Sequence, residues 1–166
     1  DECGVCGGDG LEENFLCDGT FTPETKDALQ VAVDIWVDDN ATALSTYGEI
    51  NGWDVSLITD MSSLFNSKST FNDAIGNWDV SNVTNMSYMF HYASSFNQDL
   101  NDWDVSSVTD MSWLFAFSSF NVNISSWNIS SVIDMSYIFE GANALSDENQ
   151  CEIHTSFSTN EAWPYD

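Results

Sequence analysis

Basic residues are nearly absent from this 166-residue chain, which has two lysines and no arginine against 27 acidic residues, a formal net charge of −25. A nucleic-acid-binding surface needs lysine or arginine to neutralise phosphates, so that class is excluded. Anionic membrane surfaces are disfavoured for the same reason. An acidic, lysine-poor surface suits a salty or calcium-containing exterior, where cations screen the repulsion between carboxylates.

Long apolar runs are absent as well. No stretch approaches the ~20 residues of a membrane-spanning helix, so we expect no insertion into a membrane. The chain shows no signal peptide at Asp1, and we expect it to be a mature form or a piece of a longer chain. With 43% hydrophobic residues, it is long enough for one domain with a real core.

Cysteine is scarce, and three of the four lie close to the N-terminus: Cys3, Cys6, Cys17 and Cys151. We expect an extracellular disulfide framework. A zinc site is the alternative, but the two histidines, His91 and His154, are far from the first three cysteines in the sequence. Full pairing allows three connectivities, and the sequence does not choose among them, although Cys17 pairs easily with Cys3 or Cys6.

What the sequence does contain is a repeated line. "GNWDVSNVTNMSYMF" at 76–90 returns as "NDWDVSSVTDMSWLF" at 101–115, and tryptophans mark four copies at steps of 25, 25 and 24. The rows that share these steps are Trp53, Trp78, Trp103, Trp127; Met61, Met86, Met111, Met135; and Phe65, Phe90, Phe115, Phe139. One unit cannot bury its own apolar face, whereas stacked units can, so we expect these rows to form the core.

Each unit divides into two parts. Residues 96–105 place Leu100, Trp103 and Val105 among short polar residues, which favours a brief strand. Residues 106–115 show the apolar spacing of a helix, with a serine as N-cap. The equivalent serines are Ser56, Ser81, Ser106 and Ser130. The expected fold is an α/β repeat solenoid, a leucine-rich-repeat-like right-handed stack of four coils, each with a strand and a short helix, and strands ~4.8 Å apart.

The flanking segments do not repeat. We divide the chain into a Cys/Gly/Asp-rich arm at 1–20, a helical N-terminal cap at 21–49, the four coils at 50–145 and a C-terminal cap at 146–166. Thr22 as N-cap and Pro23 as first residue open the predicted cap helix, which ends at 38–40 and is followed by a helical turn closed by Gly48. The packing residues expected in the C-terminal cap are Ile153, Phe157 and Trp163.

Carboxylates also recur with the period, as Asp54, Asp79 and Asp104, with Asn128 in the fourth copy. Catalysis needs one asymmetric constellation, whereas a repeat gives a ladder, so we expect a structural role and no enzyme. These acids should accept N–H bonds from the turn that follows. Asn72, Asn97 and Asn121 form another row, which either bonds the backbone of the next coil or consists of plain turn residues.

Two kinds of modification or ligand are expected from short motifs. Five N-x-S/T sequons occur, at Asn40, Asn82, Asn85, Asn123 and Asn128, although a Ser/Thr/Asn-rich repeat also generates sequons by chance. The acidic arm is the candidate location for a calcium site, and a merely solvated arm is the alternative. Its candidate ligands are Asp1, Asp9, Glu12 and Asp18. No other cofactor is expected.

A family resemblance rests on these residues. The unit "SFNQDLNDWDVSSVTDMSWLF" at 95–115 resembles the BspA-like leucine-rich-repeat surface proteins, whose repeat of about 25–26 residues occurs in bacterial surface lipoproteins. Residues 26–56 and 145–166 resemble the two ends of such arrays, and "DECGVCGGDG" at 1–10 is similar to Cys-Gly-Asp modules that precede them in marine microbial surface proteins. Val37 stands where such caps often have cysteine, which leaves the partner of Cys151 open.

The resemblance implies a secreted or surface-anchored protein used in adhesion or protein binding, and it supplies no catalytic residues. We therefore expect an extracellular or cell-surface module that binds a protein or glycan. The alternative is a building block of a surface layer, sheath or filament that associates with copies of itself. Exposed aromatic residues would favour binding, and self-association would favour the building block.

Overall fold

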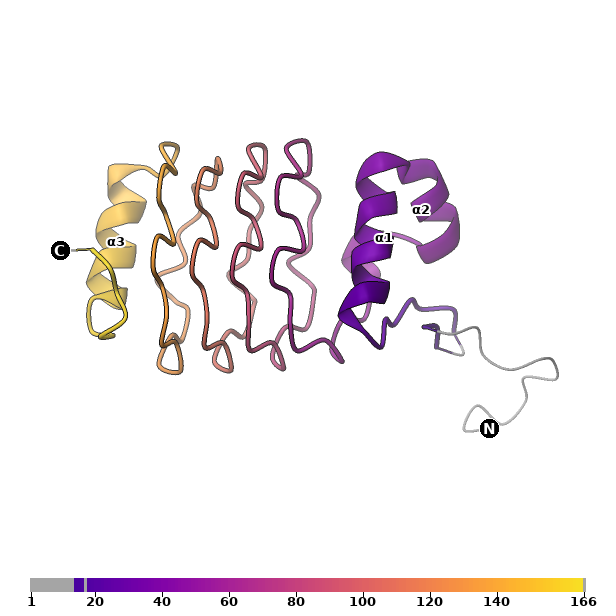
Figure 1. Cartoon of the computed structure of the whole chain (residues 1–166), viewed down its shortest axis with the longest axis horizontal. Helices are drawn as coiled ribbons and strands as arrows, with labels where there is room; N and C mark the ends of the chain where they lie inside the picture. The colour runs from indigo at the N-terminus through magenta and orange to yellow at the C-terminus, as the bar shows by residue number, and fades with distance from the viewer. Residues whose placement is uncertain (1–13, 17, 166) are drawn as a thin grey trace.

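The computed structural model describes residues 14–16 and 18–165. Two helices, α1 (Lys26–Asp38) and α2 (Asn40–Tyr47), and a short 3-10 helix, η1 (Ile50–Gly52), precede the repeats. The helix α3 (Asp147–Phe157) follows them. Figure 1 shows the repeats as coils placed side by side, with α1 and α2 at one end of the row and α3 at the other.

The repeats themselves contain neither helix nor strand: between η1 and α3 the described chain consists of turns and bends. The β-pairing between neighbouring units in this stretch consists of isolated parallel bridges, between Asp60 and Asn85, Asn85 and Asp110, and Asp110 and Asp134. The prediction of an α/β, leucine-rich-repeat-like solenoid with a strand and a helix in every coil is therefore wrong.

Consecutive turns explain why the helical spacing misled the prediction. In the first unit, Leu64 N–H donates to Met61 O at 3.3 Å and Lys68 N–H donates to Phe65 O at 3.0 Å. Such i to i+3 bonds bring side chains that are three or four residues apart to the same side of the segment, as a helix does. Ser63 and Ser67, however, have φ of 62°. A left-handed residue at these two points interrupts a helix and a strand alike.

Backbone hydrogen bonds join each of these turn segments to the next unit. From the first unit, the N–H groups of residues 61, 63, 65 and 67 donate to the carbonyls of residues 85, 87, 89 and 91, at 2.8–2.9 Å. The same four bonds recur at the next two junctions, at 2.9–3.0 Å and 2.7–2.9 Å. This regular pairing fixes the period, because a residue gained or lost inside the segment would break the register.

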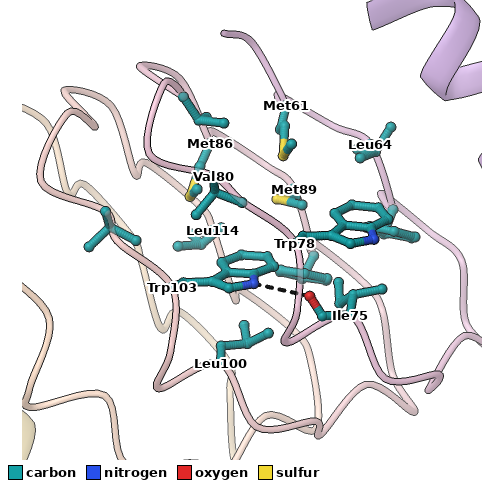
Figure 2. Packing of buried hydrophobic residues seen from close by; sticks show 14 of the residues in the cluster. Met61, Leu64, Ile75, Trp78, Val80, Met86, Met89, Leu100, Trp103 and Leu114 are labelled. Carbon is teal, nitrogen blue, oxygen red and sulfur yellow. Dashed lines mark hydrogen bonds between the residues drawn. The ribbon is translucent and has the colours of Figure 1, made fainter. Parts of the chain in front are cut away.

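The four tryptophans lie inside the stack, 2–4% exposed. The indole N–H of Trp103 donates to the carbonyl of Ile75 in the preceding unit at 3.1 Å, as Figure 2 shows. Trp78 and Trp127 make the same bond to Ile50 and Leu100, at 2.8 and 3.1 Å. Each of these three tryptophans thus satisfies its donor and ties two units together, whereas the indole N–H of Trp53 donates to Gly48 O at 3.3 Å.

Methionine and phenylalanine rows fill the rest of the core. The four repeat methionines are 0–1% exposed. The rings of Phe65, Phe90, Phe115 and Phe139 lie nearly parallel in sequence, with centroids 5.4, 5.6 and 5.8 Å apart. Such offset stacks add about 0.5–1.5 kcal/mol per pair beyond the area that they bury.

The N-terminal helix begins later than predicted. Its N-cap is Thr25, whose side chain accepts the Ala28 N–H, and not Thr22. Thr22 is buried and its N–H donates to the carbonyl of Asn14, so it belongs to the preceding segment. The helix ends at Asp38, and α2 is closed by Gly48 at φ 70°, so the predicted second helical turn is confirmed.

Both lysines hold α1 against the first repeat unit. Lys26 pairs with Asp60 at 3.2 Å, and Lys68 pairs with Asp34 of α1 at 2.7 Å. At the opposite end, α3 buries Ile153 and Phe157, and half-buried Trp163 packs edge-on against Phe157. Each end of the stack is therefore covered by a helix (Figure 1).

Candidate functional site

Two residues of every turn segment adopt left-handed backbone angles, and both columns face outward. The first column is Ser63, Tyr88, Trp113 and Tyr137, with φ between 59° and 62°. The second column is Ser67, Tyr92, Phe117 and Gly141, with φ between 54° and 65°. Bulky aromatic side chains rarely adopt this conformation, yet five of these eight positions hold one.

The aromatic side chains of the two columns, together with the ring of His91 between them, form one surface. We call it the aromatic face: Tyr88, His91, Tyr92, Trp113, Phe117 and Tyr137. In the first column Trp113 lies parallel to Tyr88 at 5.8 Å and stacks on Tyr137 at 4.4 Å. In the second column Tyr92 stacks on Phe117 at 4.8 Å. The rings therefore cross the boundaries between the second, third and fourth units.

His91 joins the two columns. Its ring lies edge-on to Tyr88 at 5.3 Å and to Trp113 at 5.7 Å in the first column. It also lies 4.3 Å from Tyr92 and 6.0 Å from Phe117 in the second. Burial lowers the pKa of His91 below its usual 6.5, which favours the neutral imidazole.

The aromatic face is open to solvent. Tyr92 and Tyr137 are 49% and 52% exposed, and Tyr88 and Phe117 are each 37% exposed. At its far end the ring of Phe117 lies over Gly141, where a Cβ atom would come within 2.4 Å of the ring. A glycine in the fourth unit therefore makes room for the last ring of the second column.

Stability alone does not account for these aromatic residues. A bulky residue held in a sparsely populated backbone region costs about 1–3 kcal/mol. Each stacked ring pair returns about 0.5–1.5 kcal/mol, so the two effects are comparable and the net gain is small. The first unit builds the same turns with Ser63 and Ser67. The fold therefore tolerates small residues here, and the rings point to contact with something else.

Charge around the aromatic face is negative. After Lys68 the sequence contains no lysine or arginine. Three residues before Trp113 and Tyr137 lie Asp110 and Asp134, whose Oδ1 atoms accept the N–H of the serine two residues on, at 2.9 and 2.8 Å. Neither aspartate is in an ion pair within the described residues, unlike Asp60 in the first unit.

The predicted row of carboxylates forms Asx turns. Oδ1 of Asp54, Asp79 and Asp104 accepts the N–H of the serine two residues on, at 3.1, 3.1 and 3.0 Å, and Asn128 does so at 3.2 Å. The serine hydroxyl and N–H lower the pKa of Asp79 and Asp104. The expectation that Ser56, Ser81, Ser106 and Ser130 cap helices is wrong, because no helix follows them.

A second such row escaped the sequence reasoning. Oδ1 of Asp60, Asn85, Asp110 and Asp134 accepts the N–H of Ser62, Ser87, Ser112 and Ser136 at 2.8–2.9 Å. The signal was present, since an aspartate or asparagine stands before Met-Ser in every copy. In each unit this Asx turn lies immediately before the turn segment that carries the two left-handed positions, and it fixes the direction in which that segment starts.

The asparagine row bonds the next unit. Asn72 Oδ1 accepts the N–H of Asn97 at 2.8 Å, and Asn97 Oδ1 accepts that of Asn121 at 2.7 Å. Asn121 continues the row to the N–H of Ser146, at 2.8 Å. Of the two interpretations left open by the sequence, the structure supports backbone bonding between units.

The sequon asparagines lie in different surroundings. Asn40 is exposed at the first residue of α2, and Asn128 is exposed as well. The side-chain amide of Asn82 donates to Ser56 O at 2.9 Å, and that of Asn123 donates to Glu152. Asn85 is half-buried in the second Asx row. Asn40 and Asn128 are thus both exposed, and the side chain of Asn128 also accepts the N–H of Ser130 at 3.2 Å.

The predicted ligands at the N-terminus lie largely outside the described residues: Asp1, Cys3, Cys6, Asp9, Glu12 and Cys17. Asp18 is exposed and accepts the N–H of Thr20 at 2.9 Å. Cys151 is exposed on α3, and His154 accepts the indole N–H of Trp163 at 3.1 Å. Within residues 14–16 and 18–165 no three potential metal ligands come together, and no helix is long and apolar enough to cross a membrane.

Comparison with known proteins gives one family. A family model described as "Mycoplasma protein of unknown function, DUF285" matches residues 37–151, from the end of α1 into α3. No curated protein and no solved structure matches the chain. The matched segment includes every residue of the aromatic face.

Proposed function

Because the chain belongs to the DUF285 family, whose description assigns no activity, we propose a function from its geometry: a non-enzymatic binding module of the cell surface or extracellular space. The observation behind this proposal is the aromatic face. Its rings occupy backbone positions that serine and glycine fill in the first and fourth units, and they stay exposed. Tyrosine and tryptophan are the residues that dominate binding energy at protein interfaces.

The acidic, lysine-poor composition supports an exterior location, where dissolved cations screen the charge. The resemblance of the repeat to BspA-like surface proteins supports the same location and a role in adhesion. The N-terminal cysteines fit an oxidising compartment. These arguments rest on composition and resemblance, and they remain part of the proposal.

Two observations favour a binding module over a self-assembling building block. A helix lies at each end of the row of units and covers part of the end surface that another copy would have to pair with (Figure 1). The net charge of −25 also opposes close association of identical chains. A partner of a different kind is therefore the better fit.

The test is a binding screen with a matched variant. The chain would be immobilised and probed with surface proteins and glycans from its native environment, in parallel with Trp113→Ser/Tyr137→Ser. Serine stands at the equivalent Ser63, so the variant keeps a side chain that this backbone already accepts. We expect at least one ligand that the chain retains and the variant loses. Identical ligand sets for the two proteins would refute the proposal.

A further inference from the structure

We propose that the aromatic face binds an arginine- or lysine-bearing segment of a partner protein; this inference names the ligand class of the proposed binding module and rests on that function. Long basic side chains have an apolar stem and a cationic head. The surface around the third and fourth units offers the complement of both parts, namely exposed rings and unpaired carboxylates.

The rings supply the apolar contact. Trp113 and Tyr137 stack at 4.4 Å, and Tyr137 is 52% exposed, so the end of this column presents ring surface to solvent. A basic stem can lie along such rings, and its head gains further from the negative face of an aromatic ring. Arginine gains most, because its planar guanidinium also stacks.

The carboxylates supply the charge. Asp110 and Asp134 stand three residues before Trp113 and Tyr137, and the N–H groups of Ser112 and Ser136 engage Oδ1 of each. Among the described residues neither has a cationic partner, whereas the equivalent Asp60 is paired with Lys26 and the equivalent Asn85 is neutral. The uncompensated charge therefore lies in the same two units as the most strongly stacked rings.

Other occupants fit less well. A second copy of this chain would bring a charge of −25 and only two lysines, both of which are engaged in ion pairs at the far end of the stack. An acidic or anionic ligand would be repelled. A neutral glycan would use the rings but would leave the negative charges of Asp110 and Asp134 without a partner. A cationic segment uses both features.

The experiment measures binding of a synthetic octapeptide in which arginine alternates with serine, at 150 mM salt, by calorimetry. The neutral control replaces each arginine with citrulline, which has nearly the same shape. We expect the arginine peptide to bind at least tenfold more tightly than the citrulline peptide. Equal affinities would overturn the inference.

Variants separate the aromatic face from general charge attraction. Trp113→Ser/Tyr137→Ser keeps the net charge, and we expect it to weaken binding at least tenfold. Asp110→Asn/Asp134→Asn uses the residue that the second unit has at Asn85, and should also weaken binding at least tenfold. The charge-matched control is Glu148→Gln/Glu161→Gln at the C-terminal end, and the apolar control is Ile133→Thr, which restores the threonine of Thr59, Thr84 and Thr109. Both controls should change affinity less than threefold.

The outcomes are distinguishable. An equal loss of affinity in Asp110→Asn/Asp134→Asn and in Glu148→Gln/Glu161→Gln would mean that net charge alone attracts the peptide. An unchanged affinity in the serine variant would mean the same. Either result would overturn the inference. A neutral cello-oligosaccharide gives a further outcome. If it binds the unmodified chain but not the serine variant, and the arginine peptide binds neither, the inference is overturned but the proposed binding function stands. If neither the peptide nor the oligosaccharide bound through the aromatic face, the inference and the proposed binding function would both be refuted. Should the serine variant fail to fold, the asparagine pair and its charge-matched control decide the question.

Discussion

Replacing Trp103 with alanine tests the claim that the tryptophan row holds neighbouring units together. The side chain is 4% exposed, and a tryptophan buries about 150–250 Å². At ~25 cal/mol per Å² its burial stabilises the fold by at most about 4–6 kcal/mol. Measured large core truncations cost about 3–5 kcal/mol. Loss of the indole bond to the Ile75 carbonyl adds only about 0.5–1 kcal/mol, because that carbonyl still accepts the Trp78 N–H at 3.1 Å.

We therefore expect Trp103→Ala to lower the free energy of unfolding by about 4–6 kcal/mol, a large share of the roughly 5–15 kcal/mol of an ordinary domain. Urea unfolding followed by circular dichroism measures the change. Trp103→Phe keeps a ring and removes the N–H, so it should cost about 1–3 kcal/mol. The control Tyr88→Ser, at an exposed position, should cost less than ~1 kcal/mol. A Trp103→Ala loss no larger than that of the control would refute a buried, bonded tryptophan row.

Four further outcomes follow from the bonds and charges described above. Asn97→Ala removes the acceptor of the Asn121 N–H and should cost about 1–3 kcal/mol in urea unfolding, whereas a silent change would mean that water replaces the asparagine. Hydrogen bonds hold the pKa of Asp79 and Asp104 below 3.8, so the stability that they add is present above pH 3.8 and is lost as the pH falls through the lower folded value. The thermal midpoint should drop below about pH 3.8, and Asp79→Asn should reduce the drop; an equal drop in the variant would assign it to other groups. In a eukaryotic secretory host, intact mass should show a glycan that Asn40→Gln removes, and a bare polypeptide mass would reject occupancy. Millimolar calcium should raise the midpoint more than sodium chloride at matched ionic strength, and equal midpoints would leave only general screening.

The sequence predicted the buried rows because burial follows the period. Trp103 and its equivalents recur at steps of 25, 25 and 24, and any stack of such units must hide them. The local structure was not predictable in the same way. The spacing of Val108, Met111 and Phe115 fits a helix, and it fits consecutive turns equally well. The left-handed backbone angle at Trp113 distinguishes consecutive turns from a helix, and a tryptophan in the sequence gives no sign of such an angle.

The aromatic face was missed for the same physical reason. Left-handed positions are recognised in a sequence by glycine or asparagine, and here the second column shows a glycine only in the fourth unit, at Gly141. Tyr88 and Tyr92 look like unrelated loop residues until the backbone places their columns side by side. The Asx rows, by contrast, were visible: the asparagine of "TNMS" and the aspartate of "TDMS" alternate at one position, which favours a turn over a site.

The two left-handed columns give this protein a grid of outward-facing positions, at which the fold accepts several different side chains. Each added repeat would bring two more such positions, one unit further along the row, without disturbing the interior. Serine, glycine, tyrosine, tryptophan and phenylalanine already share the grid in one chain. If the grid binds the partner proposed above, mutation at these points changes which partner it binds while the buried rows stay unchanged. Duplication of a unit would lengthen the grid. Arrays with the same core and different grids would then present different surfaces on one backbone.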